Sequence, residues 1–166
     1  LDGPDAIAFA QAQFANDVPA LPAGHWQWNA WLTPKGRVIA VFALLRTGAD
    51  ALRLLLPDYD AEELATALRR FVFRRKLVIA ARPDLHAAGT FTAAATARGA
   101  SFVDGHDVIE LDYGAPGLPR TLRLSPTPAR TDPDAGQAWA AAELRLGLPR
   151  LSAAQREEWA PLLLAL

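Results

Sequence analysis

Apolar residues recur with two different periods along the first half of the chain, and each period predicts its own kind of element. Between Ile7 and Val18 the period is helical, and Pro4 and Asp5 precede it as they do at helix starts. The next apolar segments alternate with polar residues or run on without a break, which is typical of strands. They cover residues 25–33, 37–46 and 51–56. The pattern predicts a helix followed by a three-stranded antiparallel meander with its second strand in the centre.

A second helix and a fourth strand are expected to complete this first module. The sequence PDYD (57–60) is typical of a helix cap, and the helix after it is predicted to run to about residue 75. Leu64, Leu68 and Phe71 would then face inward. Residues 77–81 are predicted to form the strand.

The second half of the chain has a less regular pattern. Strands are predicted over 107–113 and 120–125, followed by a proline-rich loop and by a helix over 135–146 that has Trp139, Ala142 and Leu146 on one face. A short helix over 93–98 is also expected. This order of elements predicts an α+β fold in which an antiparallel sheet has helices packed on one face, built from ferredoxin-like submodules. We expect two modules, one over 1–82 and a smaller one over 83–166 that is incomplete at its C-terminus.

Composition limits the class of protein. The chain has 166 residues, 51% of them apolar, and a formal charge of −1, so it can bury a core and does not attract nucleic acid through its net charge. Cysteine is absent, which excludes disulfides and thiol chemistry. No apolar run is long enough to span a bilayer and the start is not signal-like, so we expect a soluble, cytoplasmic protein. Methionine is also absent and residues 162–166 are all apolar, so we expect a piece of a longer product.

Nucleophilic and metal-binding chemistry finds little support in the sequence. The serines lie outside any G-x-S-x-G turn, and His25, His86 and His106 lack the spacing of metal ligands. His106, between Gly105 and Asp107, is typical of a surface turn. We therefore predict no catalytic residue and no metal site.

Three polar clusters carry the remaining candidate chemistry. Residues 69–76 hold five cations in eight positions, which either complement a helix C-terminus or bind a polyanion, namely a nucleic-acid backbone or the carboxylates of a folate tail. Lys35 and Arg37 flank Gly36 between two strands, where cations either keep a hairpin soluble or hold an anion. The third cluster ends the first helix, where such residues are typical of helix-stop chemistry. It comprises Gln11, Gln13, Asn16 and Asp17.

Four segments, taken in order, resemble one protein family. The opening LDGPDAIAFAQAQFANDV (1–18) resembles the pattern L-x-G-x-D-A-x-x-F-x-Q-x-Q-x-x-x-D-V of YgfZ-type folate-binding proteins, which are relatives of the glycine-cleavage T-protein (aminomethyltransferase). The segments WLTPKGRVIAVF (31–42), LRRFVFRRKLVI (68–79) and WAAAELRLGLPRL (139–151) are similar to those that follow in that family. Residues 82–134 align only loosely.

The resemblance implies a T-protein-like architecture that binds tetrahydrofolate. A reduced pterin needs flat apolar walls and a few amide or carboxylate partners, and its glutamate tail needs cations. The expected partners are Gln11, Gln13, Asn16 and Asp17, the walls Trp28, Trp31 and Phe73, and the cations Lys35, Arg37 and Arg74. The family role concerns the maintenance of iron–sulfur enzymes and, through them, tRNA modification. Those enzymes are therefore expected partners, whereas direct binding of nucleic acid or membrane is not expected.

Two departures from the family pattern narrow the expected activity. Aminomethyltransferases of this superfamily carry an acidic residue in the strand after the hairpin glycine, whereas here that strand begins RVIAVF (37–42). The chain also ends before the K-G-C-Y-x-G-Q motif of YgfZ-type proteins, so we expect it to lack the family's thiol. Two other hypotheses stay open: a folate-dependent one-carbon transferase in the manner of the T-protein, and a small RNA-binding module that uses residues 69–76.

Overall fold

The computed structural model describes residues 1–105, 108–148 and 150–161. The chain divides into two compact units, Leu1–Ala81 with Gly147–Leu166 and Arg82–Leu146. The modules expected from the sequence kept residues 147 onward with the second unit, whereas the structure groups them with the first. The turn expected at His106 and the apolar end over 162–166 lie outside the described residues. Among the helices that the structure describes, none is both long and apolar enough to cross a membrane.

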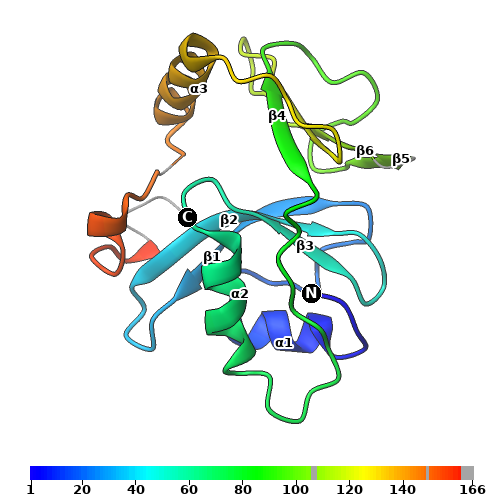
Figure 1. Cartoon of the computed structure of the whole chain (residues 1–166), viewed down its shortest axis with the longest axis vertical. Coiled ribbons are helices and arrows are strands. Elements are labelled where there is room, and N and C mark those ends of the chain that lie inside the picture. The colour runs from blue at the N-terminus through cyan, green and yellow to red at the C-terminus, as the bar shows by residue number, and fades with distance from the viewer. Residues whose placement is uncertain (106–107, 149, 162–166) are drawn as a thin grey trace. The chain divides into compact units, whose positions relative to one another are not determined.

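A three-stranded antiparallel sheet forms the centre of the first unit (Figure 1). Its strands are β1 (Trp26–Leu32), β2 (Val38–Arg46) and β3 (Leu52–Leu55), in the order β1-β2-β3. The predicted meander and the central place of β2 are confirmed, because β2 is apolar on both faces and buried along most of its length. Gly36 adopts a φ of +73° between β1 and β2, a conformation that glycine reaches without strain.

Both helices of this unit pack on the same face of the sheet, as predicted. α1 (Ala6–Gln13) lies below the sheet in Figure 1 and α2 (Ala61–Arg69) stands upright in front, and their apolar residues share one buried cluster with β2. Phe9 of α1, Phe42 of β2 and Leu68 of α2 are all inaccessible to solvent in this cluster. Burial of each such side chain contributes roughly 2 kcal/mol, so this cluster is the main source of the unit's stability.

The second helix ends earlier than the sequence pattern predicts. α2 stops at Arg69, and residues 70–76 form a loop in which Phe71 is 42% exposed rather than turned inward. The helix itself begins as predicted, because the carboxylate of Asp60 accepts the backbone N–H of Glu63 at 2.8 Å. The aromatic and β-branched run after Arg69 favours helix only weakly, so packing decides its conformation.

Residues 77–81 form no regular strand, contrary to the prediction. Val78 makes a single isolated antiparallel bridge to Asp2, with backbone hydrogen bonds of 2.8 and 3.0 Å. Asp2 also bridges Ala51, at the start of β3. The N-terminal residues therefore lie between this stretch and the meander, where a fourth strand would otherwise pair.

The other face of the same sheet carries a separate apolar cluster. Val41 is buried there with Leu151, and Trp28 packs against them. The segment that contains Leu151 is held by the carboxylate of Asp58, which pairs with Arg150 at 2.6 Å and accepts the backbone N–H of Leu151 at 3.1 Å. A short 3-10 helix, η1 (Ala153–Gln155), follows. These contacts explain why the segment belongs with the first unit.

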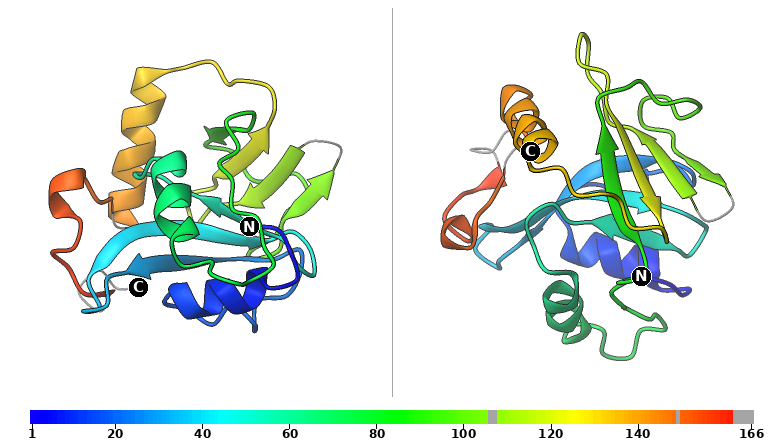
Figure 2. Two further views of the ribbon diagram at one scale, coloured as in Figure 1. Left: turned by 60° about the horizontal axis from the view of Figure 1, so that its bottom comes forward. Right: turned by 45° about the horizontal axis from the view of Figure 1, so that its top comes forward.

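The second unit is a four-stranded antiparallel sheet with one helix (Figure 2). It comprises β4 (His86–Thr90), β5 (Val103–Gly105), β6 (Val108–Asp112), β7 (Thr121–Ser125) and α3 (Pro133–Arg145), with the strand order β4-β7-β6-β5. The predictions of β6, β7 and α3 are confirmed with small shifts at their ends. β4 and β5 were not predicted, since neither HAAGT nor VDG alternates apolar with polar residues. Residues 93–98 form a loop rather than the predicted helix.

Trp139 joins α3 to this sheet. Its ring stacks on Tyr113 with 5.7 Å between the ring centres, and it lies so close to Gly89 of β4 that a Cβ there would come within 2.7 Å of the ring. The indole N–H donates to Glu143 at 2.9 Å, and the guanidinium of Arg120 lies 4.7 Å from the ring centre. Trp139 and the groups around it therefore contribute directly to the contact between helix and sheet.

Candidate functional site

The polar residues at the end of α1 mainly hold the connection to β1. The side-chain oxygen of Gln11 accepts the backbone N–H of Val18 at 2.8 Å. Asn16 donates its backbone N–H to the side-chain oxygen of Asn29 at 3.0 Å and its side-chain N–H to the carbonyl of Trp28 at 2.7 Å. The helix-stop interpretation of these amides is therefore the one that their contacts favour.

The other two members of this polar run are less constrained. The carboxylate of Asp17 accepts the backbone N–H of Ala20 at 3.1 Å through one oxygen. The side chain of Gln13 is half-buried and makes no hydrogen bond with the residues that the structure describes. Both side chains therefore keep hydrogen-bonding capacity that a ligand could use.

Sequence reasoning missed Asn29, the polar residue on which this connection depends. Asn29 is only 2% exposed on β1, and its side-chain oxygen accepts the N–H groups of both Asn16 and Ala30. Its side-chain nitrogen is buried without a hydrogen-bond partner among the described residues. The signal was present in the sequence, because an amide in the middle of the strand WQWNAWL needs an internal partner.

Trp28 and Trp31 lie on opposite faces of the sheet. Trp31 is buried in the cluster that α1 and α2 cover, while Trp28 is half-buried on the other face, edge-to-face with Trp26 at 5.9 Å between ring centres. Residues an odd number of positions apart along a strand point to opposite sides, so the spacing in the sequence already implies this result. The two indoles cannot form opposite walls around one pterin, and Trp28 is the one with exposed surface.

The cationic corner lies at the end of the β1–β2 hairpin. Lys35 is exposed, and its ammonium group has no partner within the described residues. Arg37 is also exposed, and it donates from its guanidinium to the carbonyl of Glu158 at 3.1 Å. The segment around Glu158 runs along the start of β2, where Val38 donates to the carbonyl of Trp159 at 2.8 Å. Of the two cations, Lys35 is therefore the freer to meet an anion.

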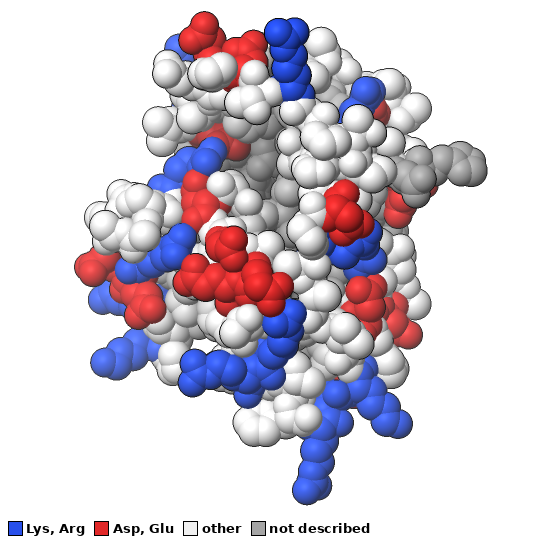
Figure 3. Space-filling view, viewed as in Figure 1, with Lys and Arg blue, Asp and Glu red and all other residues white. Residues whose placement is uncertain are grey.

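Phe73 and Arg74 lie in the loop over 70–76, at the opposite end of α1. Together with Arg75 they line an open hollow beside Asp5 and Ala8, in the first turn of α1 and just before it. Figure 3 shows Lys and Arg side chains projecting around the end of α2 and this loop, at the bottom of the view. Ala8, which lines this hollow, and Gln13, at the end of the helix, are five residues apart, which corresponds to about 7.5 Å along the axis of α1.

The expected site residues therefore fall into separate places within the first unit. Phe14, at the end of α1, bridges Trp31, which is two residues before the hairpin corner begins at Thr33. The polar run and the corner thus lie toward the same end of α1. Phe73 and Arg74 lie toward the other end, and they do not share a pocket with the rest.

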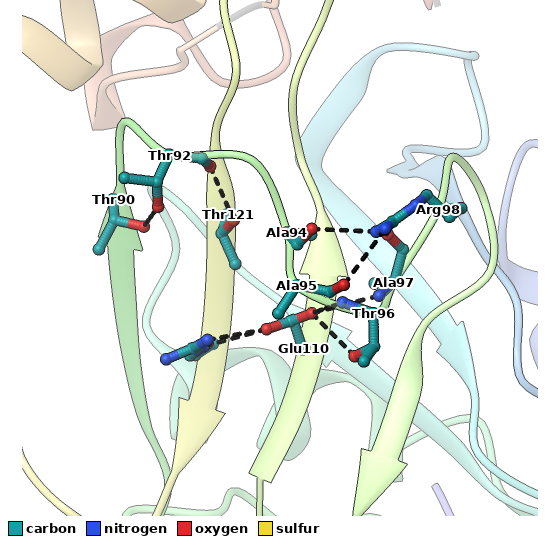
Figure 4. A network of polar contacts seen from close by, with 10 residues as sticks. Thr90, Thr92, Ala94, Ala95, Thr96, Ala97, Arg98, Glu110 and Thr121 are labelled. Carbon is teal, nitrogen blue, oxygen red and sulfur yellow. Dashed lines mark hydrogen bonds and ion pairs between the residues drawn. The ribbon is translucent and has the colours of Figure 1, made fainter.

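A polar network in the second unit was also missed from the sequence (Figure 4). The buried carboxylate of Glu110 on β6 accepts the N–H and hydroxyl of Thr96 at 2.8 and 3.0 Å and the N–H of Ala97 at 3.2 Å. Its other oxygen accepts from the guanidinium of Arg123 at 2.9 Å. The backbone N–H of Thr96 and the other donors outweigh the desolvation of the carboxyl and lower the pKa of Glu110 to about 2. These contacts hold the loop over 93–98 in place of the predicted helix.

Arg120 is the most deeply buried charged residue of the second unit among those described. It is 1% exposed, its guanidinium lies 5.1 Å from the ring centre of Tyr113 and 4.7 Å from that of Trp139, and its Nε and one terminal nitrogen have no hydrogen-bond partner among the described residues. Burial lowers the pKa of Arg120, while the negative charge of Glu143 opposes that shift. Because Arg120 packs against these two rings beneath α3, its role is structural.

Comparison with known proteins assigns the fold. No family model matches the chain, and no curated protein matches it. Among solved structures, the glycine cleavage system aminomethyltransferase T from Bartonella henselae superposes with a TM-score of 0.59 over 88% of this chain, at 17% sequence identity. The chain has the T-protein-like α+β fold. It spans 42% of the length of that aminomethyltransferase, and at this identity the likeness concerns the fold alone.

Proposed function

We propose that the chain binds a reduced folate along β1 of the first unit. The observation that carries this proposal is the arrangement of Trp28 and the cationic corner at two ends of one strand. Thr33, where the corner begins, is five residues after Trp28, which corresponds to about 16 Å along an extended strand. An extended folate has a flat ring at one end and carboxylates at the other, over a comparable length. The shared T-protein-like fold and the sequence resemblance support the same ligand.

The chemistry of each end suits one part of the ligand. The exposed part of the Trp28 ring offers a flat apolar surface for a pterin, and Asp17, whose backbone carbonyl accepts from Gln27 of β1, offers a carboxylate for its polar edge. Lys35 and Arg37 offer positive charge for the glutamate tail. Asn16 keeps its role of fixing the backbone of Trp28, which positions the aromatic surface.

The finer role that we propose is that of a YgfZ-type accessory protein. It would act with iron–sulfur enzymes and, through them, in tRNA modification, as the sequence resemblance implies. Aminomethyl transfer is the less favoured alternative, because β2 reads VIAVFALLR and contains no carboxylate to stabilise positive charge on a folate nitrogen. A single-turnover assay with methylene-tetrahydrofolate and an aminomethyl donor distinguishes the two, and we expect no product.

Calorimetric titration with mono- and triglutamates of 5-formyltetrahydrofolate tests folate binding. The wild-type chain should bind the triglutamate more tightly, and Lys35→Ala/Arg37→Ala should remove that preference. Trp28→Leu should weaken both ligands about tenfold, which is about 1.4 kcal/mol. The double variant Arg130→Ala/Arg145→Ala removes two exposed cations elsewhere and serves as the control. Absence of binding to the wild-type chain, or equal affinities in all variants, would contradict the proposal.

A further inference from the structure

The loop over 70–76 holds cations whose presence the helix dipole does not explain. Because α2 ends at Arg69, only Arg69 lies in its last turn. Arg69 is already engaged, through an ion pair with Glu62 at 2.8 Å and a hydrogen bond to the carbonyl of Ile79 at 2.9 Å. Arg70 is the C-cap of α2 and lies at the negative end of the dipole, but Arg74, Arg75 and Lys76 follow at least four residues later and need another reason.

These later cations are available for an external anion. The side chains of Arg70, Arg74 and Lys76 are exposed and make no hydrogen bond or ion pair with the residues that the structure describes. The guanidinium of Arg75 lies over the ring of Phe9, 5.9 Å from its centre, which leaves its N–H groups free to donate. The acidic side chain at the edge of the hollow belongs to Asp5, and it accepts the backbone N–H of Lys76.

An aromatic residue, Phe73, lies among these cations in a strained backbone conformation. Phe73 is 89% exposed and has a φ of +47°, a left-handed conformation that is strained for a bulky residue. Nothing in the packing compensates for the strain, since the ring touches solvent over almost its whole surface. Strain of this kind is found at binding sites, where it holds a side chain ready for a ligand. Phe71, two residues earlier, exposes part of its ring as well.

We propose that this loop, residues 70–76, binds single-stranded nucleic acid, at a surface separate from the folate site. An exposed ring provides a face on which an unstacked base can lie, and guanidinium groups bind the phosphates on either side. The hollow beside Phe73 offers room for that base. A lipid surface would need a continuous apolar face, and the loop has two phenylalanines. An acidic peptide would use the cations without a need for the exposed ring.

Fluorescence anisotropy with a labelled 12-nucleotide oligouridylate tests this proposal on the whole chain. Four cations that contact phosphates predict a slope of about −3 for log K against log salt, so affinity should fall roughly 50-fold between 50 and 200 mM NaCl. Arg70→Ala/Arg74→Ala should reduce the steepness of that slope by about 1.4. Arg130→Ala/Arg145→Ala, which removes the same charge from the other unit, should leave the slope unchanged.

Substitution of Phe73 separates stacking from general attraction of anions. Phe73→Gly removes the ring at a position whose φ suits glycine, so the chain stays folded, and affinity should fall by between about 5- and 150-fold. Phe73→Tyr keeps a ring and should keep the affinity. Equal affinity of Phe73→Gly and the wild-type chain would overturn the proposal. So would affinity that does not change with salt, or binding to vesicles with one-quarter phosphatidylserine in place of the oligonucleotide. None of these outcomes bears on folate binding.

Discussion

At the scale of single residues, the roles of polar side chains follow from which backbone groups lack a partner. Asn29 satisfies the N–H groups of Asn16 and Ala30, so one buried amide fixes the chain between α1 and β1. Gln11 does the same for Val18. A backbone N–H buried without a partner costs about 1–3 kcal/mol, which is reason enough for these amides to be present. A ligand site built on this run must therefore use the side chains that the backbone leaves free.

Phe73 allows a test of backbone strain at this scale. Phe73→Gly should raise the free energy of unfolding by about 1 kcal/mol. The left-handed conformation costs a residue with a Cβ about 1–2 kcal/mol, and relief of this strain is partly offset because glycine loses more conformational entropy on folding. Phe71→Gly, in the same loop but without a positive φ, is the matched control and should lower stability. Urea denaturation followed by circular dichroism measures both. Destabilisation of equal size in the two variants would show that Phe73 is not strained.

At the scale of elements, the sequence predicted those helices and strands whose formation depends on the local pattern of apolar and polar residues. β1, β2 and α1 were predictable because alternation and helical spacing match the faces that are buried. The end of α2 at Arg69 was not predictable, because the residues after it keep apolar positions at helical spacing. In the structure these residues form a loop, in which the backbone N–H of Lys76 donates to Asp5 at the start of α1. The absence of a strand at 77–81 has a similar cause, since Asp2 pairs with both Ala51 and Val78. Contacts between residues far apart in sequence determined both the end of α2 and the absence of this strand.

The candidate site was less predictable than the elements around it. The residue types suited to a pterin and its tail were visible in the sequence, but the bonds that they make within the chain were not. Asn16 could have been a ligand or an anchor, and only its 2.7 Å hydrogen bond to the carbonyl of Trp28 distinguishes the two. The separation of Trp28 from Trp31, by contrast, follows from strand geometry and could have been predicted.

The contact between α3 and β4 gives a prediction at the scale of elements. Gly89→Ala places a Cβ 2.7 Å from the ring of Trp139, which has backbone and Tyr113 around it and must move as a whole. We expect the second unit to lose about 2 kcal/mol of stability, as in other overpacked interiors. Gly105→Ala, in β5, meets nothing within 4 Å and is the control. Chemical denaturation should show a lower midpoint for the first variant alone, and equal midpoints would contradict the described packing.

At the scale of the whole molecule, two units with different internal chemistry share one chain. The first unit is held mainly by the apolar cluster between α1, α2 and the sheet. The second combines apolar contacts with three buried charged groups among the described residues, Glu110, Arg120 and Glu143. Charged groups in such places make stability depend on pH, whereas apolar clusters do not. The described structure therefore predicts that the second unit responds to acid through an identifiable residue.

That residue is Glu110, and the sign of its effect follows from its pKa. Because the pKa of Glu110 falls from about 4.5 to about 2 on folding, its ionised form is bound more strongly in the folded chain. Its contribution is fully present above about pH 4.5 and is lost as the pH falls toward 2. In Glu110→Gln this part of the pH dependence should disappear, and the second unit should be less stable than wild type at pH 7 but similar near pH 2. Asp104→Asn, which removes an exposed carboxylate from β5, is the control.

Fluorine NMR of protein labelled with 5-fluorotryptophan can follow this unit by itself, since Trp139 is the one tryptophan between residues 82 and 146. Its resonance can be assigned with Trp139→Phe. Urea titrations at pH 7, 5 and 3 should give midpoints that fall between pH 5 and pH 3 in the wild-type chain and in Asp104→Asn, and that fall less over this interval in Glu110→Gln. If the three proteins lose stability in parallel, the hydrogen bonds from Thr96, Ala97 and Arg123 do not stabilise the Glu110 carboxylate in solution, and another group must hold the loop over 93–98.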